Sequence, residues 1–404
     1  MGRPALELAD IFRLHGPAYR EAYRGMINSM QRRVMRAIEI CRTAVLGGHV
    51  EKCDHCGHRR IHYNSCGNRH CNKCQSLARA RWLEKHCAQL LPVPYFHVVF
   101  TLPAALSSLA LQNQRVVYGI LFRAAAQTLR RIAADPKHLG ARIGFLAVLH
   151  TWGQNLQHHP HLHCVVPSGG LSSDGRRWIR GRAHFFLPVR VLSRLFRGVF
   201  LHDLQQAQAA AKLRFHGSLQ KFADADADAF AHLIKTCRRI EWVVYAKPPF
   251  GGPEQVLDYL GRYTHRVAIS NNRLISLENG KVTFRWKDYQ AGNKQKRMTL
   301  DAEEFIRRFL LHVLPAGFVR IRHYGWLANA QRRQKLALCR ELLGVQQPER
   351  EQQPFAENLG EANKGLTAAS FMICPACGQG HMVVIDVIDP TGSLREPMPA
   401  IDSS

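Results

Sequence analysis

Histidines recur at every second position near the middle of the chain, within the run 158–166 of sequence His-His-Pro-His-Leu-His-Cys-Val-Val. On a β-strand, His159, His161 and His163 would share one face, because successive side chains point to opposite faces. Neutral imidazole is a common ligand of divalent metals. The spacing predicts a metal site on one face of a strand. Hydrogen-bonded histidines near a sheet edge, where Pro160 is also tolerated, are the alternative.

Two tyrosines form a second set that could do chemistry. Pro253 is expected to open a helix, on which Tyr259 and Tyr263 share one face because they are four residues apart. A buried apolar stripe would explain the same spacing. The neighbouring residues favour exposed tyrosines, since a core stripe seldom carries phosphate-binding groups. These groups are Arg262, His265 and Arg266.

Cysteines are the third set, with twelve in the chain. Four of them form two CxxC pairs separated by fourteen residues: Cys53, Cys56, Cys71 and Cys74. Two such pairs predict a zinc site with four thiolate ligands. Cys66 and His70 lie between the pairs, so a different choice of four ligands, or a second ion, is the alternative. Arg69 and Lys73 are candidates for phosphate contacts, although a purely structural zinc module fits equally well.

A lone CxxC pair near the C-terminus consists of Cys374 and Cys377. One such pair provides only half of a zinc site. His381 and Cys339 are candidate completing ligands.

The charge of the chain is unusual. Its 404 residues include 56 Lys and Arg against 30 Asp and Glu, a net charge of +26. Such a charge attracts polyanions, of which nucleic acid is the usual one. Because the sequence shows neither a membrane-spanning apolar run nor a signal peptide, we expect a soluble cytoplasmic protein with no membrane partner.

Helices and strands must position these groups. We expect strands at 95–103, 143–150 and 242–246, and a helix at 106–134, around the histidine strand. Strand 143–150 should pair antiparallel with the histidine strand through a short connection, which would place the metal site in mid-sheet. A basic hairpin over 281–300 carries Arg285 and Lys287. A capping box of Asp301 and Glu304 should start the next helix.

The three sets together specify a reaction. A metal held by histidines would polarise a phosphodiester, and a tyrosine oxygen would attack the phosphorus to give a covalent phosphotyrosine. That bond keeps the energy of the phosphodiester, so a 3′ hydroxyl can later rejoin the strand. Two tyrosines allow two such exchanges.

The chain resembles the rolling-circle transposases of the insertion-sequence ninety-one family, which are two-tyrosine HUH endonucleases. The resemblance extends from about Leu6 to about Leu343. Five matching segments support it: the 53–74 cysteine finger, 95–103, 159–163, 259–270 and 323–325.

This resemblance implies that His161 and His163 bind Mg or Mn and that Tyr259 and Tyr263 are the nucleophiles. It also implies that the chain binds zinc and that it is a prokaryotic protein associated with the nucleoid. The implied partners are single-stranded transposon ends and target DNA. The implied fold is α+β: a central antiparallel sheet flanked by helices, with the histidine strand central and the tyrosine helix packed across it. A helical and zinc-finger module would precede the sheet, and a helical basic part would follow it.

Two questions stay open at this point. No acidic residue stands at an obvious position for a third metal ligand, and the candidates are Gln154, His150, His159 and Asn271. The function also has two rivals. One is a plasmid replication initiator or relaxase with the same HUH chemistry, and the other is a non-catalytic zinc-finger DNA-binding regulator.

The sequence suggests five parts. They are a helical segment (1–48), a zinc-binding domain (49–92), a catalytic domain (93–300) with a helical insertion at about 190–239, a helical basic segment (301–345), and a linker and tail (346–404).

Overall fold

The computed structural model describes residues 6–87, 89–182, 187–223, 228–250, 268–288, 291–292, 294–345 and 373–390. Contacts within the chain divide it into two compact units. Unit 1 consists of Met1–Leu77 with Gln352–Ser404, and unit 2 is Ala78–Glu351. No described helix has both the length and the apolar composition that crossing a bilayer requires.

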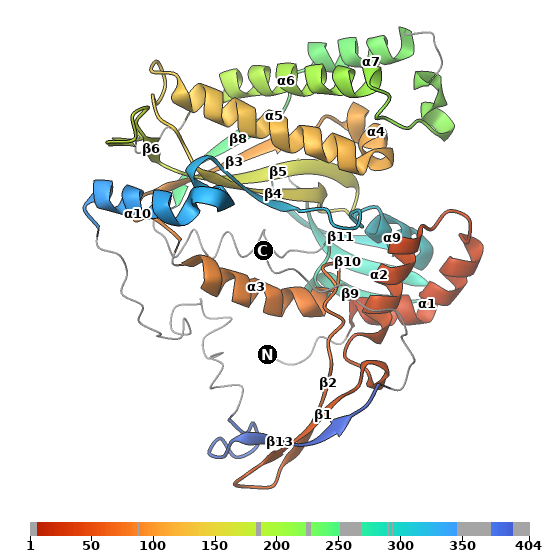
Figure 1. The fold of residues 1–404 in the computed structure, drawn as a ribbon. Helices are drawn as coiled ribbons and strands as arrows, with labels where there is room; N and C mark the ends of the chain where they lie inside the picture. Colours follow the sequence, from red (N-terminus) through yellow and green to blue (C-terminus); the bar gives the residue numbers. More distant parts are fainter. Residues whose placement is uncertain are drawn as a thin grey trace. The chain divides into compact units, whose positions relative to one another are not determined.

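A five-stranded antiparallel sheet forms the centre of unit 2 (Figure 1). Its strands, in spatial order, are β12 (Ile321–Tyr324), β4 (Phe145–Trp152), β5 (His158–Pro167), β3 (Tyr95–Thr101) and β8 (Val244–Phe250). The predicted antiparallel pairing of β4 with the histidine strand is confirmed. The histidines therefore lie on the central strand of the sheet.

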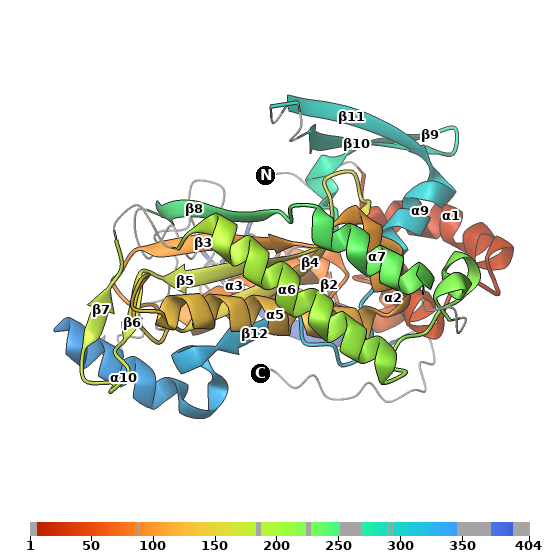
Figure 2. The same ribbon diagram turned by 90° about the horizontal axis from the view of Figure 1, so that it is seen from above.

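Helices cover one face of this sheet, as Figure 2 shows for α5 (Gln114–Ala134) and α6 (Val189–Ala209). Alternation along β5 explains why. Leu162, Cys164 and Val166 are fully buried in the same hydrophobic core as residues of both helices. The intervening residues of β5, which include His161 and His163, point to the opposite face. The predicted α+β fold, with an antiparallel sheet flanked by helices, is confirmed. The remaining helices of this layer are α4 (Ser107–Gln112) and α7 (Asp228–Arg239).

A second sheet in unit 2 contains the predicted basic hairpin. It consists of β9 (Leu274–Glu278), β10 (Lys281–Asp288) and β11 (Lys294–Asp301), followed by α9 (Ala302–Leu310). The predicted capping box at the start of α9 is wrong, because the Asp301 side chain makes no capping hydrogen bond. Glu304 instead accepts hydrogen bonds from Arg307 and Arg308, one turn further along the helix.

The part of unit 2 that the structure describes also contains two short strands and a further helix. They are β6 (Gly169–Leu171), which pairs with β7 (Trp178–Arg180), and the helix α10 (Arg332–Leu343).

Unit 1 combines helices with a three-stranded sheet. Its elements are α1 (Leu8–Ala22), α2 (Ser29–Ile40), β1 (Gly48–Cys53), β2 (Arg59–Tyr63), β13 (Met382–Ile388) and the first turns of α3 (Asn72–Cys87). Asn28 starts α2 through a reciprocal capping box with Gln31. The sheet order is β13-β1-β2, so a strand from near the C-terminus pairs with one from near the N-terminus (Figure 1).

Candidate metal and DNA-binding sites

Three imidazoles converge on the face of the main sheet opposite α5 and α6. His161 and His163 come from β5, and His150 comes from β4, where it lies directly opposite His161 in the antiparallel register. Cross-strand partners point to the same face. The potential ligand nitrogens of the three residues all lie within 4.8 Å of one another. His150 and His163 are buried and His161 is only half-buried, so the set is accessible from one side.

Hydrogen bonds orient two of these rings. Nδ1–H of His161 donates to the backbone carbonyl of His159 at 2.7 Å, which directs Nε2 of His161 as the metal-binding nitrogen. Nδ1 of His163 lies 2.8 Å from Nε2 of His97, a buried residue of β3. Burial, followed by the charges of Lys247 and His161, lowers the pKa of His97 to about 3. A neutral His97 can accept the Nδ1 proton of His163, which directs Nε2 of His163 as its metal-binding nitrogen.

The chemistry of the donors indicates which ion they suit. Among the described residues, the converging set contains three nitrogens and no carboxylate. Imidazole suits transition-metal ions, whereas Mg²⁺ prefers oxygen ligands. The residues therefore fit a divalent transition-metal ion better than Mg²⁺.

Of the two histidines proposed as a third metal ligand, His150 belongs to the converging set. His159 lies beside His161, with ring centroids 5.3 Å apart, but does not belong to the converging set. Gln154 lies in the connection between β4 and β5, where its backbone carbonyl accepts a hydrogen bond from Arg273. Asn271 begins the short helix η4 (Asn271–Arg273). The short β4–β5 connection indicates an antiparallel neighbour, but the pairing of His150 with His161 also depends on a register shift between His150 and Trp152.

The predicted nucleophiles and their basic neighbours lie outside the described residues. They are Tyr259, Arg262, Tyr263, His265 and Arg266, all within 251–267. The strand that leads into this segment, β8, pairs with β3, the neighbour of the histidine strand.

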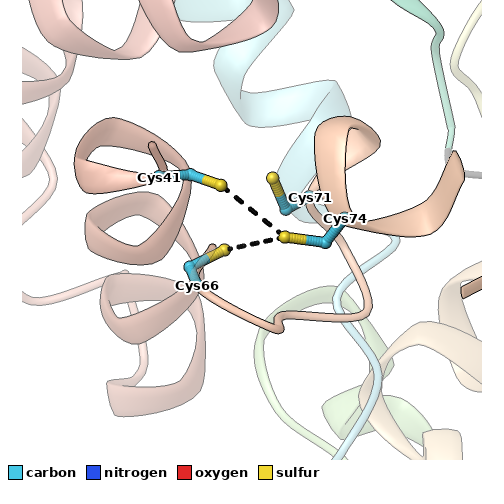
Figure 3. Close-up of side chains that lie close together, drawn as sticks. All are labelled: Cys41, Cys66, Cys71 and Cys74. Carbon is cyan, nitrogen blue, oxygen red and sulfur yellow. Dashed lines mark hydrogen bonds between the residues drawn. The ribbon is translucent and has the colours of Figure 1, made fainter. Parts of the chain in front are cut away.

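Among the described residues, eight cysteines form two clusters with four members each, as in the predicted alternative of a different choice of ligands or a second ion. The first comprises Cys41, Cys66, Cys71 and Cys74 (Figure 3). The Sγ atom of Cys74 lies 3.6 Å from that of Cys41 and 3.5 Å from that of Cys66. Tetrahedral zinc with bonds of about 2.3 Å places its sulfurs about 3.8 Å apart, so this cluster fits zinc. Hydrogen bonds from the Cys41 and Cys66 thiols hold the pKa of Cys74 far below its usual value.

The second cluster comprises Cys53, Cys56, Cys374 and Cys377. The prediction that the first CxxC pair shares an ion with Cys71 and Cys74 is therefore wrong. The first pair lies at the end of β1, where β13 brings the C-terminal pair beside it. The expected completing ligands also differ, because Cys339 is buried in unit 2 beside Trp326 and Leu336.

Known proteins match both the cysteine region and the histidine region of the chain. A family model described as "Transposase zinc-binding domain" matches residues 11–102, and one described as "Putative transposase" matches residues 144–335. The chain is 60% identical over 389 residues to "Putative transposase y4qJ" of Sinorhizobium fredii, which covers 96% of this chain and 97% of that relative. The chain belongs to the insertion-sequence ninety-one family of transposases. This transposase is also 30% identical over 311 residues to the "Transposase for insertion sequence element IS801" of Pseudomonas savastanoi pv. phaseolicola, covering 76% of this chain and 73% of that relative.

Among solved structures, the transposase is similar to a conjugative relaxase, TrwC, in complex with oriT DNA. The similarity has a TM-score of 0.22 and 16% sequence identity, and it covers 42% of this chain and 71% of the relaxase.

Two predicted phosphate-binding residues of the transposase lie in unit 1, and one of them forms a buried ion pair there. Nζ of Lys73 lies 2.5 Å from Oε2 of Glu7, and the Lys73 side chain is only 10% exposed. Proposing it as a phosphate contact was wrong, because its charge neutralises a buried carboxylate. Arg69 is half-buried, and that burial lowers its pKa.

The hairpin residues of the transposase agree better with a role in binding DNA. Arg285 and Lys287 are exposed on β10, on the side opposite Phe284, which packs against Phe305 of α9. Arg297 of β11 lies directly across from Arg285. This side of the hairpin is a basic surface.

A basic cleft of about 870 Å³ lies between α5, β12 and α10 in the transposase. The sequence did not single it out, since its residues come from distant segments. Two aromatic side chains, Tyr324 and Trp326, line it together with cationic ones. Cationic and aromatic groups in one groove suit the phosphates and bases of a single strand. The cationic lining residues are Arg123, Arg130, Arg131, Arg142 and Lys335.

Proposed function

We propose that this transposase cuts and rejoins single-stranded DNA at the ends of its mobile element by HUH chemistry, with His150, His161 and His163 as the metal ligands and Tyr259 and Tyr263 as the nucleophiles. The observation that carries the proposal is the convergence of three histidine nitrogens on one face of the central strand. Membership in a transposase family supports the substrate class.

The histidines position the scissile phosphate for the tyrosines. A divalent ion bound by them would polarise the phosphodiester and offset the charge that develops on it. The phenolic oxygen of one tyrosine bonds to phosphorus and loses its proton, while the bond from phosphorus to the 3′ oxygen breaks and that oxygen leaves as a hydroxyl. The strand then carries a 5′ phosphotyrosine and a 3′ hydroxyl. In the reverse sense, a 3′ hydroxyl attacks the phosphotyrosine and releases the tyrosine, which reseals the strand.

The test is covalent capture. We expect the purified full chain, incubated with a single-stranded oligonucleotide of the element's end and Mn²⁺, to give a protein–DNA species that survives denaturation. Tyr259→Phe combined with Tyr263→Phe should abolish this species and leave non-covalent DNA binding intact, because a phenyl ring keeps the shape and lacks the nucleophile.

Two outcomes would count against the proposal. A regulator would bind DNA and form no covalent species under any metal condition. A replication initiator would form the adduct but would not join the cut strand to a second DNA in a strand-transfer assay with element ends.

A further inference from the structure

The first and last CxxC pairs of unit 1 have the same local structure. Both read Cys-x-x-Cys-Gly, with Gly57 and Gly378 in the left-handed region at φ +72° and +67°. In each, the backbone N–H two residues after the first cysteine donates to its Sγ, at 3.4 Å in both cases. Glycine is favoured at such φ values, which close a tight turn. The two turns therefore present their thiolates in the same way.

The four sulfurs have the spacing of a metal site. Sγ of Cys53 lies 3.8 Å from Sγ of Cys377, and Sγ of Cys56 lies 3.6 Å from Sγ of Cys374. These separations match the roughly 3.8 Å edge of a zinc tetrathiolate. They are far from the disulfide distance of about 2.05 Å. Four cysteines from two turns are the usual donor set of structural zinc.

The backbone around the four cysteines allows the two turns to come close together. A Cβ on Gly380 would lie only 2.5 Å from Sγ of Cys53 and 2.6 Å from the Asp54 carboxylate, so only glycine fits there. The Asp54 carboxylate accepts a hydrogen bond from the backbone N–H of His381 at 2.8 Å, and Asp54 N–H donates to the His381 carbonyl at 3.1 Å. Next to the cluster, β13 pairs with β1 along the whole length of β1.

We propose that Cys53, Cys56, Cys374 and Cys377 bind a second zinc ion, which fastens the C-terminal segment to β1 and completes the sheet of unit 1. The zinc-binding family model ends at residue 102, so two of these four ligands lie outside it. The site joins residues 318 positions apart in the sequence. It is independent of the first cluster, whose four cysteines all lie between residues 41 and 74, and of the histidine site.

Zinc stoichiometry of the full chain tests the proposal. We expect native mass spectrometry and atomic emission to find two zinc ions per chain when the histidine site is removed by His161→Ala and His163→Ala, so that only the cysteine clusters are counted. In this background, Cys374→Ser combined with Cys377→Ser should retain one ion, and Cys41→Ser should also retain one. His381→Ala and Cys339→Ser are the matched controls and should keep both ions, because neither residue belongs to a cluster.

Hydrogen exchange provides a readout that does not depend on counting ions. In the Cys374→Ser, Cys377→Ser variant, the amides of β1 that pair with β13 should lose protection, while those of α1 and α2 stay protected. One zinc ion per wild-type chain would overturn the proposal, as would an unchanged count in the double variant. If the variant loses protection everywhere, it has failed to fold, and Co²⁺ is then substituted into the wild-type chain instead. Two tetrathiolate Co²⁺ sites in the wild-type chain support the proposal, and one site overturns it.

Discussion

His150 on β4 lies directly across from His161 on β5, and this single cross-strand pair adds a third nitrogen to the two supplied by the histidine strand. The adjacent His159, on the same strand as His161, does not join the set. Geometry therefore separates two histidines that composition alone treats alike.

Replacing His150 by alanine should lower metal-dependent nicking by more than roughly 10–100-fold. That range is the usual effect of losing a residue that only hydrogen-bonds to a metal ligand. The reason is that the variant loses one of three converging nitrogens. His159→Ala is the matched control and should stay within a few-fold of wild type. Single-turnover cleavage of an end oligonucleotide at varied Mn²⁺ measures both. Equal effects of the two substitutions would refute the assignment.

His97 should act as a positioning residue through Nδ1 of His163. We expect His97→Ala to weaken metal affinity by roughly 10–100-fold, with activity recovering at high Mn²⁺. His97→Gln should retain more affinity, since an amide oxygen can still accept the Nδ1 proton. If high Mn²⁺ does not restore the activity of His97→Ala, the substitution has damaged the sheet rather than the position of His163.

His312 makes the stability of unit 2 depend on pH. Its Nε2–H donates to the Leu156 carbonyl at 3.0 Å, and its Nδ1 accepts from the Thr151 hydroxyl at 3.2 Å. Burial lowers its pKa from 6.5 to about 3. Between those values the unfolded chain binds the proton and the folded chain does not, so stability present above pH 6.5 is lost as the pH falls.

At pH 5 the loss from this one histidine should be about 2 kcal/mol. Urea unfolding of wild type and His312→Gln at pH 7.5 and pH 5 measures it, because the amide cannot take up a proton. The variant should show the smaller drop between the two pH values. Identical drops would show that other groups carry the dependence.

Arg130 and Arg131 lie exposed at the end of α5 and line the basic cleft. Replacing both by alanine should weaken binding of single-stranded DNA. The salt dependence of the binding constant should fall by roughly one unit of slope for each phosphate that the variant no longer neutralises. Arg238→Ala with Arg239→Ala removes the same charge from an exposed position at the end of α7 and should change the slope much less. Fluorescence anisotropy over a salt series compares them.

Gly325 is the last residue of the His-Tyr-Gly segment, 323–325, that resembles the family, and its backbone geometry requires glycine. Its φ is +62°, and a Cβ there would overlap the carbonyl oxygen of Ile143. Gly280 has a similar φ of +72° and open space around it. Gly280→Ala should cost only the left-handed strain, roughly 1–3 kcal/mol, whereas Gly325→Ala should cost clearly more. Thermal unfolding of the two variants distinguishes clash from strain.

Local patterns in the sequence predicted most of the sheet. The alternation along 158–166 identified the histidine strand and its two faces, and the short connection to 143–150 predicted the antiparallel neighbour. Register was harder, since the position of His150 opposite His161 depends on a bulge between His150 and Trp152. His97 escaped notice because its strand is separated from β5 by helices, and only pairing brings the two together.

The cysteines show the limit of spacing as a guide. Cys53 and Cys56 have a partner pair at an ideal distance in the sequence, yet their partners lie beyond residue 370. The local difference is small: a glycine follows Cys56 and Cys377, whereas Gln75 follows Cys74. Likewise, Lys73 appears in the sequence as an exposed cation, and only the fold reveals the buried Glu7 beside it.

The pairing of β13 with β1 also bears on how the protein is made. Ribosomes add roughly 5–20 residues per second, so the 318 residues between Cys56 and Cys374 take about 15–60 s to emerge. Throughout that time β1 has β2 on one edge and nothing yet synthesised for the other. Unit 1 can therefore be completed only after all of unit 2, residues 78–351, has been synthesised.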